Sequence, residues 1–166
     1  MNIHIGGVTR GVLYCGLIFI SSAAAFAGST TSPPKLGPMK DIQNLGMPWE
    51  QSYGYAQAVR VGNTVWLSGQ FGHDARGNLV GSDTESQMRQ AYANIQTLLS
   101  RYGLTMDNIV EETAFVTDVD AAIAARTKIG RIVYRDPTRV TSNLIGVSRL
   151  FLPLQKIEIK VTAIVH

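Results

Sequence analysis

The side chains of the C-terminal run, residues 157–165, alternate between two kinds. Successive residues of a β-strand point to opposite faces of the sheet, so the odd-numbered residues, which are all apolar, share one face. Glu158, Lys160 and Thr162 share the other face with Ile164. Such a strand belongs in a sheet whose apolar face is covered by other elements. Its second face, half polar and half apolar, suits solvent or a subunit interface that contains a cleft.

Four more runs have the composition of β-strands. Residues 55–61 and 64–68 flank Gly62-Asn63, a two-residue sequence typical of a hairpin turn. Residues 110–117 and 143–150 are the other two runs. Trp66 lies inside an apolar run, so the pattern alone does not assign it to either face of the sheet.

Two helices are predicted between these strands. Ser82 and Glu85 have the spacing of a capping box, and Gly103 stands where a C-terminal glycine cap belongs. Apolar residues recur between them at helical spacing, at Met88, Ala91, Ile95, Leu98, Leu99 and Tyr102. A second helix is predicted to follow Asp118 or Asp120 and to run to residue 134. The order β-β-α-β-α-β-β predicts an α+β sandwich with both helices on one face of a mixed sheet.

The first 27 residues have the pattern of a signal peptide. Arg10 supplies the basic start, an apolar run follows, and Ala25-Phe26-Ala27 matches a signal-peptidase site. The apolar run is shorter than the ~20 residues of a membrane-spanning helix, so a membrane anchor is the less favoured interpretation. Cys15 lies inside that run, which argues against a lipoprotein. We therefore expect cleavage after Ala27 and a periplasmic or secreted protein that has no membrane partner after cleavage.

The mature chain is predicted to have two parts. Residues 28–48 contain four prolines and three glycines, a composition typical of a tether or an extended arm. Residues 49–166 are predicted to form the compact domain. Since Cys15 is the chain's one cysteine, this domain contains none, and burial of apolar surface must hold it together without disulfides.

Composition argues against several kinds of partner and site. Loss of Arg10 lowers the formal net charge from +3 to +2, and the basic residues are scattered, so nucleic acid is not an expected partner. Beyond residue 27 the sequence has two histidines and no cysteine, and it has no nucleotide-binding glycine motif, so neither a metal nor a cofactor is expected. His73, beside Asp74, is the one candidate for a histidine base, although a solvated turn is the commoner role of such a pair.

Several short motifs, in this order and spacing, resemble the Rid (RidA/YjgF) family from residue 49 to the C-terminus. They are Tyr55-Ala56-Gln57-Ala58-Val59, Ser68-Gly69-Gln70 with Asp74, Gly77-Asn78-Leu79-Val80, Gln87 with Asn94, Phe115-Val116-Thr117-Asp118, Leu150 with Pro153, and Ile157-Glu158-Ile159 with Ala163. The resemblance implies a chorismate-mutase-like protomer and a homotrimer with clefts between its subunits. It also implies hydrolysis of 2-imino and 2-enamino acids to 2-keto acids and ammonia without a cofactor.

The resemblance also implies roles for individual residues. Glu158 matches the glutamate that positions the attacking water, and Ser68 and Tyr55 match residues that shape the pocket. Each has a structural alternative. Glu158 fits a solvated strand carboxylate, Ser68 fits a hydroxyl that bonds the nearby backbone, and Tyr55 fits a packing residue.

The sequence departs from the family at the arginine that holds the substrate carboxylate. Counting back from Arg149-Leu150 without a gap puts Ser142 at the arginine position. Arg139 lies three residues upstream, roughly 10 Å along a strand, and this odd offset turns its side chain to the opposite face. Arg126 is a further candidate for charge in the cleft, although an exposed helical arginine is the expected alternative. A serine cannot replace the charged fork of an arginine around a carboxylate.

These residues leave two hypotheses open for the function. The first is a small-molecule cleft at a subunit interface that hydrolyses or deaminates imines, enamines or related substrates without a cofactor. In this hypothesis Ser142 alters the specificity, with Arg139 retained as a candidate substrate-binding residue. The alternative is a non-enzymatic trimer that binds a metabolite or regulates another protein.

Overall fold

The computed structural model describes Gly37 and residues 39–165. The predicted signal peptide and the first part of the predicted tether lie outside the described residues. The predicted strand and helix order is confirmed, with one short strand and one short helix added before it. The elements are β1 (Asp41–Gln43), α1 (Pro48–Tyr53), β2 (Ala58–Val61), β3 (Thr64–Gln70), α2 (Thr84–Ser100), β4 (Ile109–Val116), α3 (Val119–Val133), β5 (Thr141–Gly146) and β6 (Ile157–Ile164), with 3-10 turns at Met106–Asn108 and Pro137–Arg139.

The strands form one mixed sheet in the order β1-β2-β3-β6-β4-β5. β4 and β5 run parallel, and the other neighbouring strands are antiparallel. A parallel pair needs a crossover connection, which α3 supplies between β4 and β5. The predicted Gly62-Asn63 hairpin joins β2 to β3, and Gly62 takes the positive φ of 59° that this turn requires.

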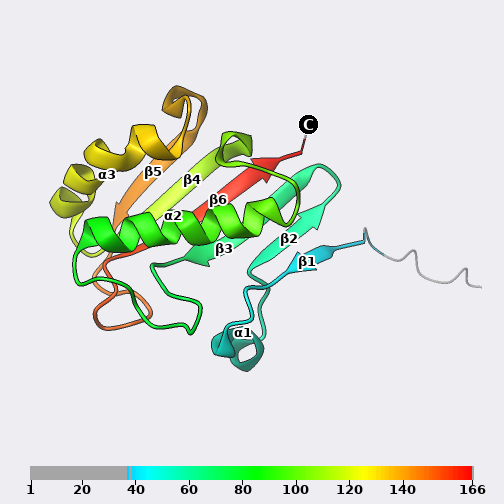
Figure 1. The fold of residues 1–166 in the computed structure, drawn as a ribbon, viewed down its shortest axis with the longest axis horizontal. Helices are drawn as coiled ribbons and strands as arrows, with labels where there is room; N and C mark the ends of the chain where they lie inside the picture. Colours follow the sequence, from blue (N-terminus) through cyan, green and yellow to red (C-terminus); the bar gives the residue numbers. More distant parts are fainter. Residues whose placement is uncertain (1–36, 38, 166) are drawn as a thin grey trace, which may run out of the picture. The chain divides into compact units, whose positions relative to one another are not determined.

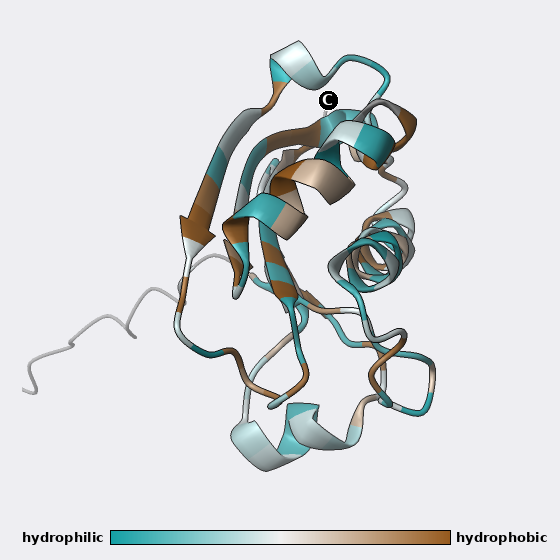
Figure 2. Cartoon of the chain, turned by 90° about the vertical axis from the view of Figure 1, so that its left-hand side faces the viewer, coloured by the Kyte–Doolittle hydropathy of each residue, from teal (hydrophilic) through white to brown (hydrophobic). Residues whose placement is uncertain are grey.

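Both long helices lie on the same side of the sheet, as Figures 1 and 2 show and as predicted. The alternation in β6 is confirmed, because Ile157, Ile159, Val161 and Ala163 are buried beneath the helices. α2 contributes Met88, Ala91, Ile95, Leu98 and Leu99 to this core, which are five of the six positions predicted from helical spacing. The side chains of Glu158, Lys160 and Thr162 lie on the other face of the sheet.

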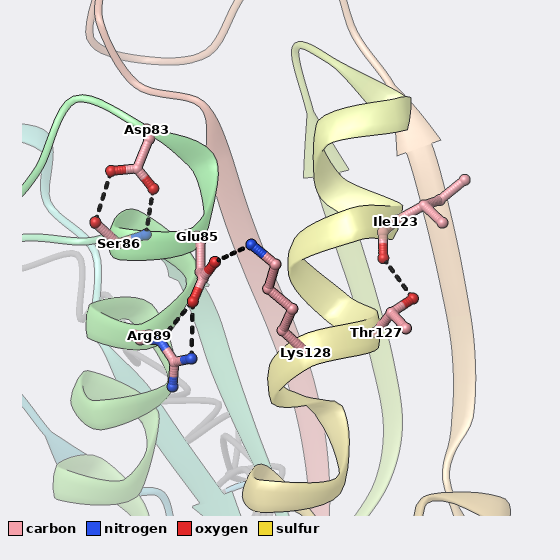
Figure 3. Close-up of polar contacts among 7 residues, drawn as sticks. All are labelled: Asp83, Glu85, Ser86, Arg89, Ile123, Thr127 and Lys128. Atoms are coloured by element: carbon pink, nitrogen blue, oxygen red, sulfur yellow. Dashed lines mark hydrogen bonds and ion pairs between the residues drawn. The ribbon is translucent and has the colours of Figure 1, made fainter.

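The N-terminus of α2 differs from the predicted capping box by one residue. Asp83, not Ser82, is the N-cap, and its carboxylate accepts from the Ser86 backbone N–H at 2.9 Å and from the Ser86 hydroxyl at 2.7 Å (Figure 3). Glu85 instead joins the two helices by pairing with Arg89 at 2.8 Å and with Lys128 of α3 at 3.0 Å. A carboxylate is the stronger acceptor at an N-cap, and it favours the positive end of the helix dipole.

Part of the predicted tether is folded. Asp41–Gln43 forms the edge strand β1 and pairs with β2, and α1 begins at Pro48. The buried Glu50 carboxylate accepts from the backbone N–H groups of Leu45 at 2.8 Å and Gly46 at 2.9 Å, which fixes the turn between β1 and α1. The compact unit therefore begins before Trp49, because backbone pairing and this carboxylate hold the preceding residues despite their proline and glycine content.

Two strand boundaries also differ from the prediction. β5 covers Thr141–Gly146 rather than residues 143–150, because it ends where its partner β4 ends, at the pair Val116 and Gly146. β2 begins at Ala58 rather than at residue 55, and residues 54–57 connect it to α1.

Trp66 lies opposite Thr162 and is 43% exposed, which assigns it to the face away from the helices. Within the described part of the chain, none of the helices has the length and apolar character needed to cross a membrane.

Candidate functional site

Tyr55, Ser68 and Glu158 lie in one pocket, although 90 residues separate Ser68 from Glu158 in the sequence. The pocket has a volume of about 360 Å³. Its lining comes from α1 and the residues after it, from β3 and the residue that follows it, from β6, and from the loop before β6. The lining residues are Trp49, Tyr53, Tyr55, Ser68, Gly69, Phe71, Phe151 and Glu158.

Glu158 lies directly against the backbone of β3. A Cβ atom added to Gly69 would stand 2.0 Å from Glu158 Oε1, so this approach requires glycine. Glu158 Oε2 accepts from the Gln155 amide at 3.1 Å, and Gln155 is itself buried. Among the described residues no group donates to Oε1, which leaves that atom available in the pocket. Glu158 is thus a partly buried and oriented carboxylate, unlike the freely solvated one considered from the sequence.

The Ser68 hydroxyl donates to the backbone carbonyl of Ala56 at 2.7 Å. The Ser68 proton is therefore used in a backbone hydrogen bond, as the structural alternative expected. The Ser68 oxygen can still accept a hydrogen bond from a ligand. The pairing of β3 with β6 is irregular between Leu67 and Gln70, so Ser68 and Gly69 occupy a bulge. Bulges next to sites of this kind redirect side chains.

Tyr55 follows α1 after Gly54, whose left-handed conformation at φ 67° ends that helix. Burial raises the pKa of the Tyr55 phenol, and the negative charges of Glu50 and Glu158 raise it further. The phenol therefore stays protonated throughout the neutral range and can donate a hydrogen bond into the pocket.

Aromatic residues that the sequence patterns did not single out form much of the wall. Trp49 packs against Phe71 with ring centroids 5.5 Å apart and against His73 at 5.2 Å. Tyr53 and Phe151, which both line the pocket, pack edge to face with ring centroids 5.5 Å apart. The one sequence signal for them was the density of aromatic residues between positions 49 and 55.

His73 is not placed to act as a base in this pocket. It is buried behind Trp49 and Phe71, and its Nδ1 lies 2.9 Å from the Asp74 carbonyl oxygen. Asp74 accepts from the backbone N–H groups of the following turn rather than from the imidazole. The solvated turn expected for His73 is therefore wrong, since the side chain belongs to the aromatic packing under the pocket.

Ser142 lies in a different cavity, of about 260 Å³, on the helix side of the sheet. Its hydroxyl donates to Glu112 Oε1 at 3.2 Å. Arg126 of α3 pairs with the same oxygen, and its guanidinium lies 5.9 Å from the Tyr92 ring centroid and 5.6 Å from that of Tyr134. Arg126 is thus a partly buried member of an ion pair and not the exposed helical arginine that was expected.

Arg139 is exposed in the 3-10 turn Pro137–Arg139 and borders a third cavity, with Asp107 and Asp136. Within one protomer, the structure therefore brings together three of the five predicted site residues. Ser142 and Arg139 do not line that pocket, and each of the two lines a different cavity. Within residues 37 and 39–165, no group of three or more His, Cys, Asp or Glu side chains is arranged to hold a metal ion.

Comparison with known proteins gives consistent matches. The sequence model of the family described as endoribonuclease L-PSP matches residues 49–165. A 2-iminobutanoate/2-iminopropanoate deaminase of Dermatophagoides farinae is 38% identical over 63 residues, which are 37% of this chain and 49% of that protein. The aligned region thus spans about half the length of that relative. The deaminase of the same name from Salmonella typhimurium is 32% identical over 111 residues, which are 66% of this chain and 86% of that protein.

The solved structures agree with the sequence comparison. The crystal structure of the Rid-family protein YyfA from Yersinia pestis has a TM-score of 0.66 and 28% identity, and the match covers 76% of this chain and 100% of that one. The α+β arrangement with two helices on one face is the chorismate-mutase-like fold of these neighbours, as predicted. The chain belongs to the endoribonuclease L-PSP family, which is the Rid (RidA/YjgF) family.

Proposed function

We propose that this protein hydrolyses small imines or enamines without a cofactor, in the pocket of Tyr55, Ser68 and Glu158. The observation that carries the proposal is the meeting of these three side chains in one cavity of about 360 Å³. The deaminase names of the two relatives support this reaction class. Their chemistry, addition of water to a C=N bond, requires a proton acceptor for the water and donors around the substrate.

The free Oε1 of Glu158 accepts a proton from the attacking water. The Ser68 oxygen accepts a hydrogen bond from the substrate N–H. The water oxygen bonds to the iminium carbon while the π-electron pair moves to nitrogen, which gives a neutral carbinolamine and a protonated Glu158, and the Tyr55 phenol donates a hydrogen bond to this carbinolamine. Glu158 then returns its proton to the amino nitrogen, ammonia leaves as the hydroxyl oxygen forms the C=O bond, and ammonia takes up the hydroxyl proton as ammonium. The overall reaction balances as R₂C=NH₂⁺ + H₂O → R₂C=O + NH₄⁺.

The specificity differs from that of the relatives that act on 2-imino acids. By its spacing from Arg149-Leu150, Ser142 stands at the position of the family's carboxylate-binding arginine, and from its own cavity it would reach this pocket only across a subunit interface. Among the described residues, no arginine or lysine lines the pocket. A carboxylate in this pocket would face Glu158 without a cation to offset the repulsion. The proposed substrates are therefore imines or enamines that lack a carboxylate.

We further propose a homotrimer that is exported after cleavage near residue 27. β5 is exposed along its whole length at the edge of the sheet, and Trp66 is exposed on the face opposite the helices. Exposed apolar groups of this kind are typical of subunit interfaces. A trimer would bring the β5 edge of one subunit close to a neighbour and make position 142 part of an interface.

The test compares two classes of imine generated in situ by purified oxidases. An amine oxidase supplies carboxylate-free imines, and an amino-acid oxidase supplies 2-imino acids. We expect release of the carbonyl product above the buffer rate for the first class and not for the second, with loss of the effect in Glu158→Gln. Lys160→Gln, two residues along the same strand face, is the matched control and should behave as the unaltered protein.

Each other outcome has a defined meaning. Rapid release of keto acids from 2-imino acids would contradict the role given to Ser142. If neither class of imine gives carbonyl product above the buffer rate, the proposed hydrolase activity is overturned. A trimer that binds small molecules without turnover would then be the function, and the commitment of the Ser68 proton to Ala56 is the observation that favours this alternative.

A further inference from the structure

We infer that the pocket selects a small cation without a carboxylate group, an iminium or ammonium ion, through Glu158 and the aromatic pair Tyr53 and Phe151. The inference rests on the proposed function and names its substrate class. The described pocket combines three features that favour a positive ligand: a carboxylate with a free oxygen, a second carboxylate nearby, and aromatic walls.

Within one protomer, the described side chains that line the pocket carry charge of one sign. Glu158 is the one charged side chain among the eight lining residues. Glu50 is buried nearby. Burial is the first cause of the raised pKa of the Tyr55 phenol, and the charges of Glu50 and Glu158 raise it further. These two negative charges would favour a cation at the same place. Lys160 shares the strand face of Glu158 but does not line the pocket.

The walls of the pocket complement this charge. Five of the eight lining residues are aromatic, and their ring faces attract cations more than neutral molecules of the same size. Tyr53 is 64% exposed and Phe151 is 47% exposed, yet both line the pocket and pack together with perpendicular rings. Large aromatic side chains left in water beside a cavity are typical of a ligand-binding site.

The charge of the ligand also suits the proposed reaction. The iminium form of an imine carries the positive charge on the nitrogen and makes its carbon more electrophilic. Glu158 would stabilise that ion and then accept the proton of the attacking water. One carboxylate therefore both selects the reactive protonation state and serves as the base.

The test uses three ligands of one shape and different charge, which are n-butylammonium, 1-butanol and butyrate at pH 7. Titrations of the purified protein are followed by NMR chemical shifts. We expect n-butylammonium to bind about tenfold more tightly than 1-butanol and butyrate to bind most weakly. The preference should shrink at high salt. Equal binding of butyrate and n-butylammonium, or no binding of any of the three, would overturn the inference.

Two variants separate charge from general damage to the pocket. Glu158→Gln keeps the shape and the rings, so it should remove most of the preference for n-butylammonium over 1-butanol and leave the smaller part that the rings supply. Phe151→Leu should weaken n-butylammonium more than 1-butanol, since leucine has no ring to attract a cation. Lys160→Gln is the control and should leave the ratio of affinities unchanged. An unchanged ratio in Glu158→Gln would contradict the assignment.

This experiment is independent of turnover. Preference for the cation without hydrolysis of any imine would support the inference and contradict the proposed function. Hydrolysis of imines with equal binding of butyrate and n-butylammonium would support the proposed function and contradict the inference.

Discussion

Ser142 donates its hydroxyl to Glu112 Oε1, the same carboxylate oxygen that pairs with Arg126. Glu112 is fully buried, and Tyr92 and Tyr134 donate to its other oxygen. An arginine is therefore present beside position 142, but it comes from α3 and is neutralised by a buried carboxylate. The charge available at this place pairs with Glu112 and links α3 to the sheet.

Removing that arginine should destabilise the fold. Arg126→Met keeps much of the side-chain length but leaves Glu112 buried without its cation. We expect a loss of about 3 kcal/mol, at the lower end of the range for a buried pair because Arg126 is itself partly exposed. Urea unfolding of the variant and the unaltered protein measures this change in the free energy of unfolding. Ser142→Ala removes a weaker donor to the same carboxylate and should cost about 1 kcal/mol or less. Equal effects of the two variants would contradict this ranking.

The close approach of Glu158 to Gly69 gives a prediction about activity. Gly69→Ala places a methyl carbon 2.0 Å from the present position of Glu158 Oε1, which is too close for both to stay in place. The Glu158 side chain can swing aside, so the fold should survive, but its carboxylate would leave the position proposed for the base. Imine hydrolysis should fall about a hundredfold, the typical cost of displacing a reacting group by an ångström.

Gly37→Ala is the matched control for this substitution, because a Cβ at Gly37 meets no atom within 4 Å. It should leave both the activity and the unfolding midpoint unchanged. Retention of full activity in Gly69→Ala would show that the position of Glu158 does not matter for turnover.

Local patterns in the sequence predicted most of the fold, because each pattern follows from what one strand, helix or turn requires of its own residues. The alternation in β6 reflects a sheet with one covered face, and Gly62-Asn63 reflects the left-handed backbone of a two-residue turn. Asp118 was one of two predicted caps, and it does accept from the Ala121 N–H at 2.9 Å. β1 was missed because its three residues, Asp41–Gln43, are too few to show an alternation and lie in a stretch rich in proline and glycine.

The site was less predictable because its walls are built by contacts between distant segments. Tyr53 meets Phe151 nearly a hundred residues away, and the Trp49 ring fits where Gly77 has no side chain. No local spacing reports such pairs. Tyr55, Ser68 and Glu158 came from the family resemblance, and their shared pocket is a consequence of β3 and β6 being neighbours.

Tyr102 gives a prediction about alkaline stability. Its hydroxyl donates to the carbonyl of Asp41 at 3.0 Å, and burial, followed by the charge of Asp41, raises the pKa of Tyr102 to about 12. An unfolded tyrosine loses its proton near pH 10, about two units earlier. Between these values the unfolded state binds fewer protons than the folded state, so stability should fall as the pH rises from about 10 to about 12.

Tyr102→Phe should flatten this decline, because phenylalanine has no proton to lose. Urea midpoints of both proteins at several pH values between 8 and 11.5 measure the difference. Tyr92 and Tyr134 also have raised pKa values, chiefly from burial, so part of the decline should remain in the variant. Parallel pH profiles of the two proteins would contradict the assignment to Tyr102.

Tyr55 gives a prediction about the pH dependence of turnover. Burial and the charges of Glu50 and Glu158 raise the pKa of its phenol above that of an ordinary tyrosine. The phenol is proposed to donate to the carbinolamine formed by water addition, so kcat/KM for a carboxylate-free imine should show no loss from Tyr55 between pH 7 and pH 9. Tyr55→Phe removes the donor but keeps the ring, and it should lower kcat/KM roughly a hundredfold across that range. Binding of n-butylammonium should change much less, since the ring and Glu158 remain. A Tyr55→Phe variant with unchanged kcat/KM would assign the phenol to packing alone, the alternative that its sequence position also allowed.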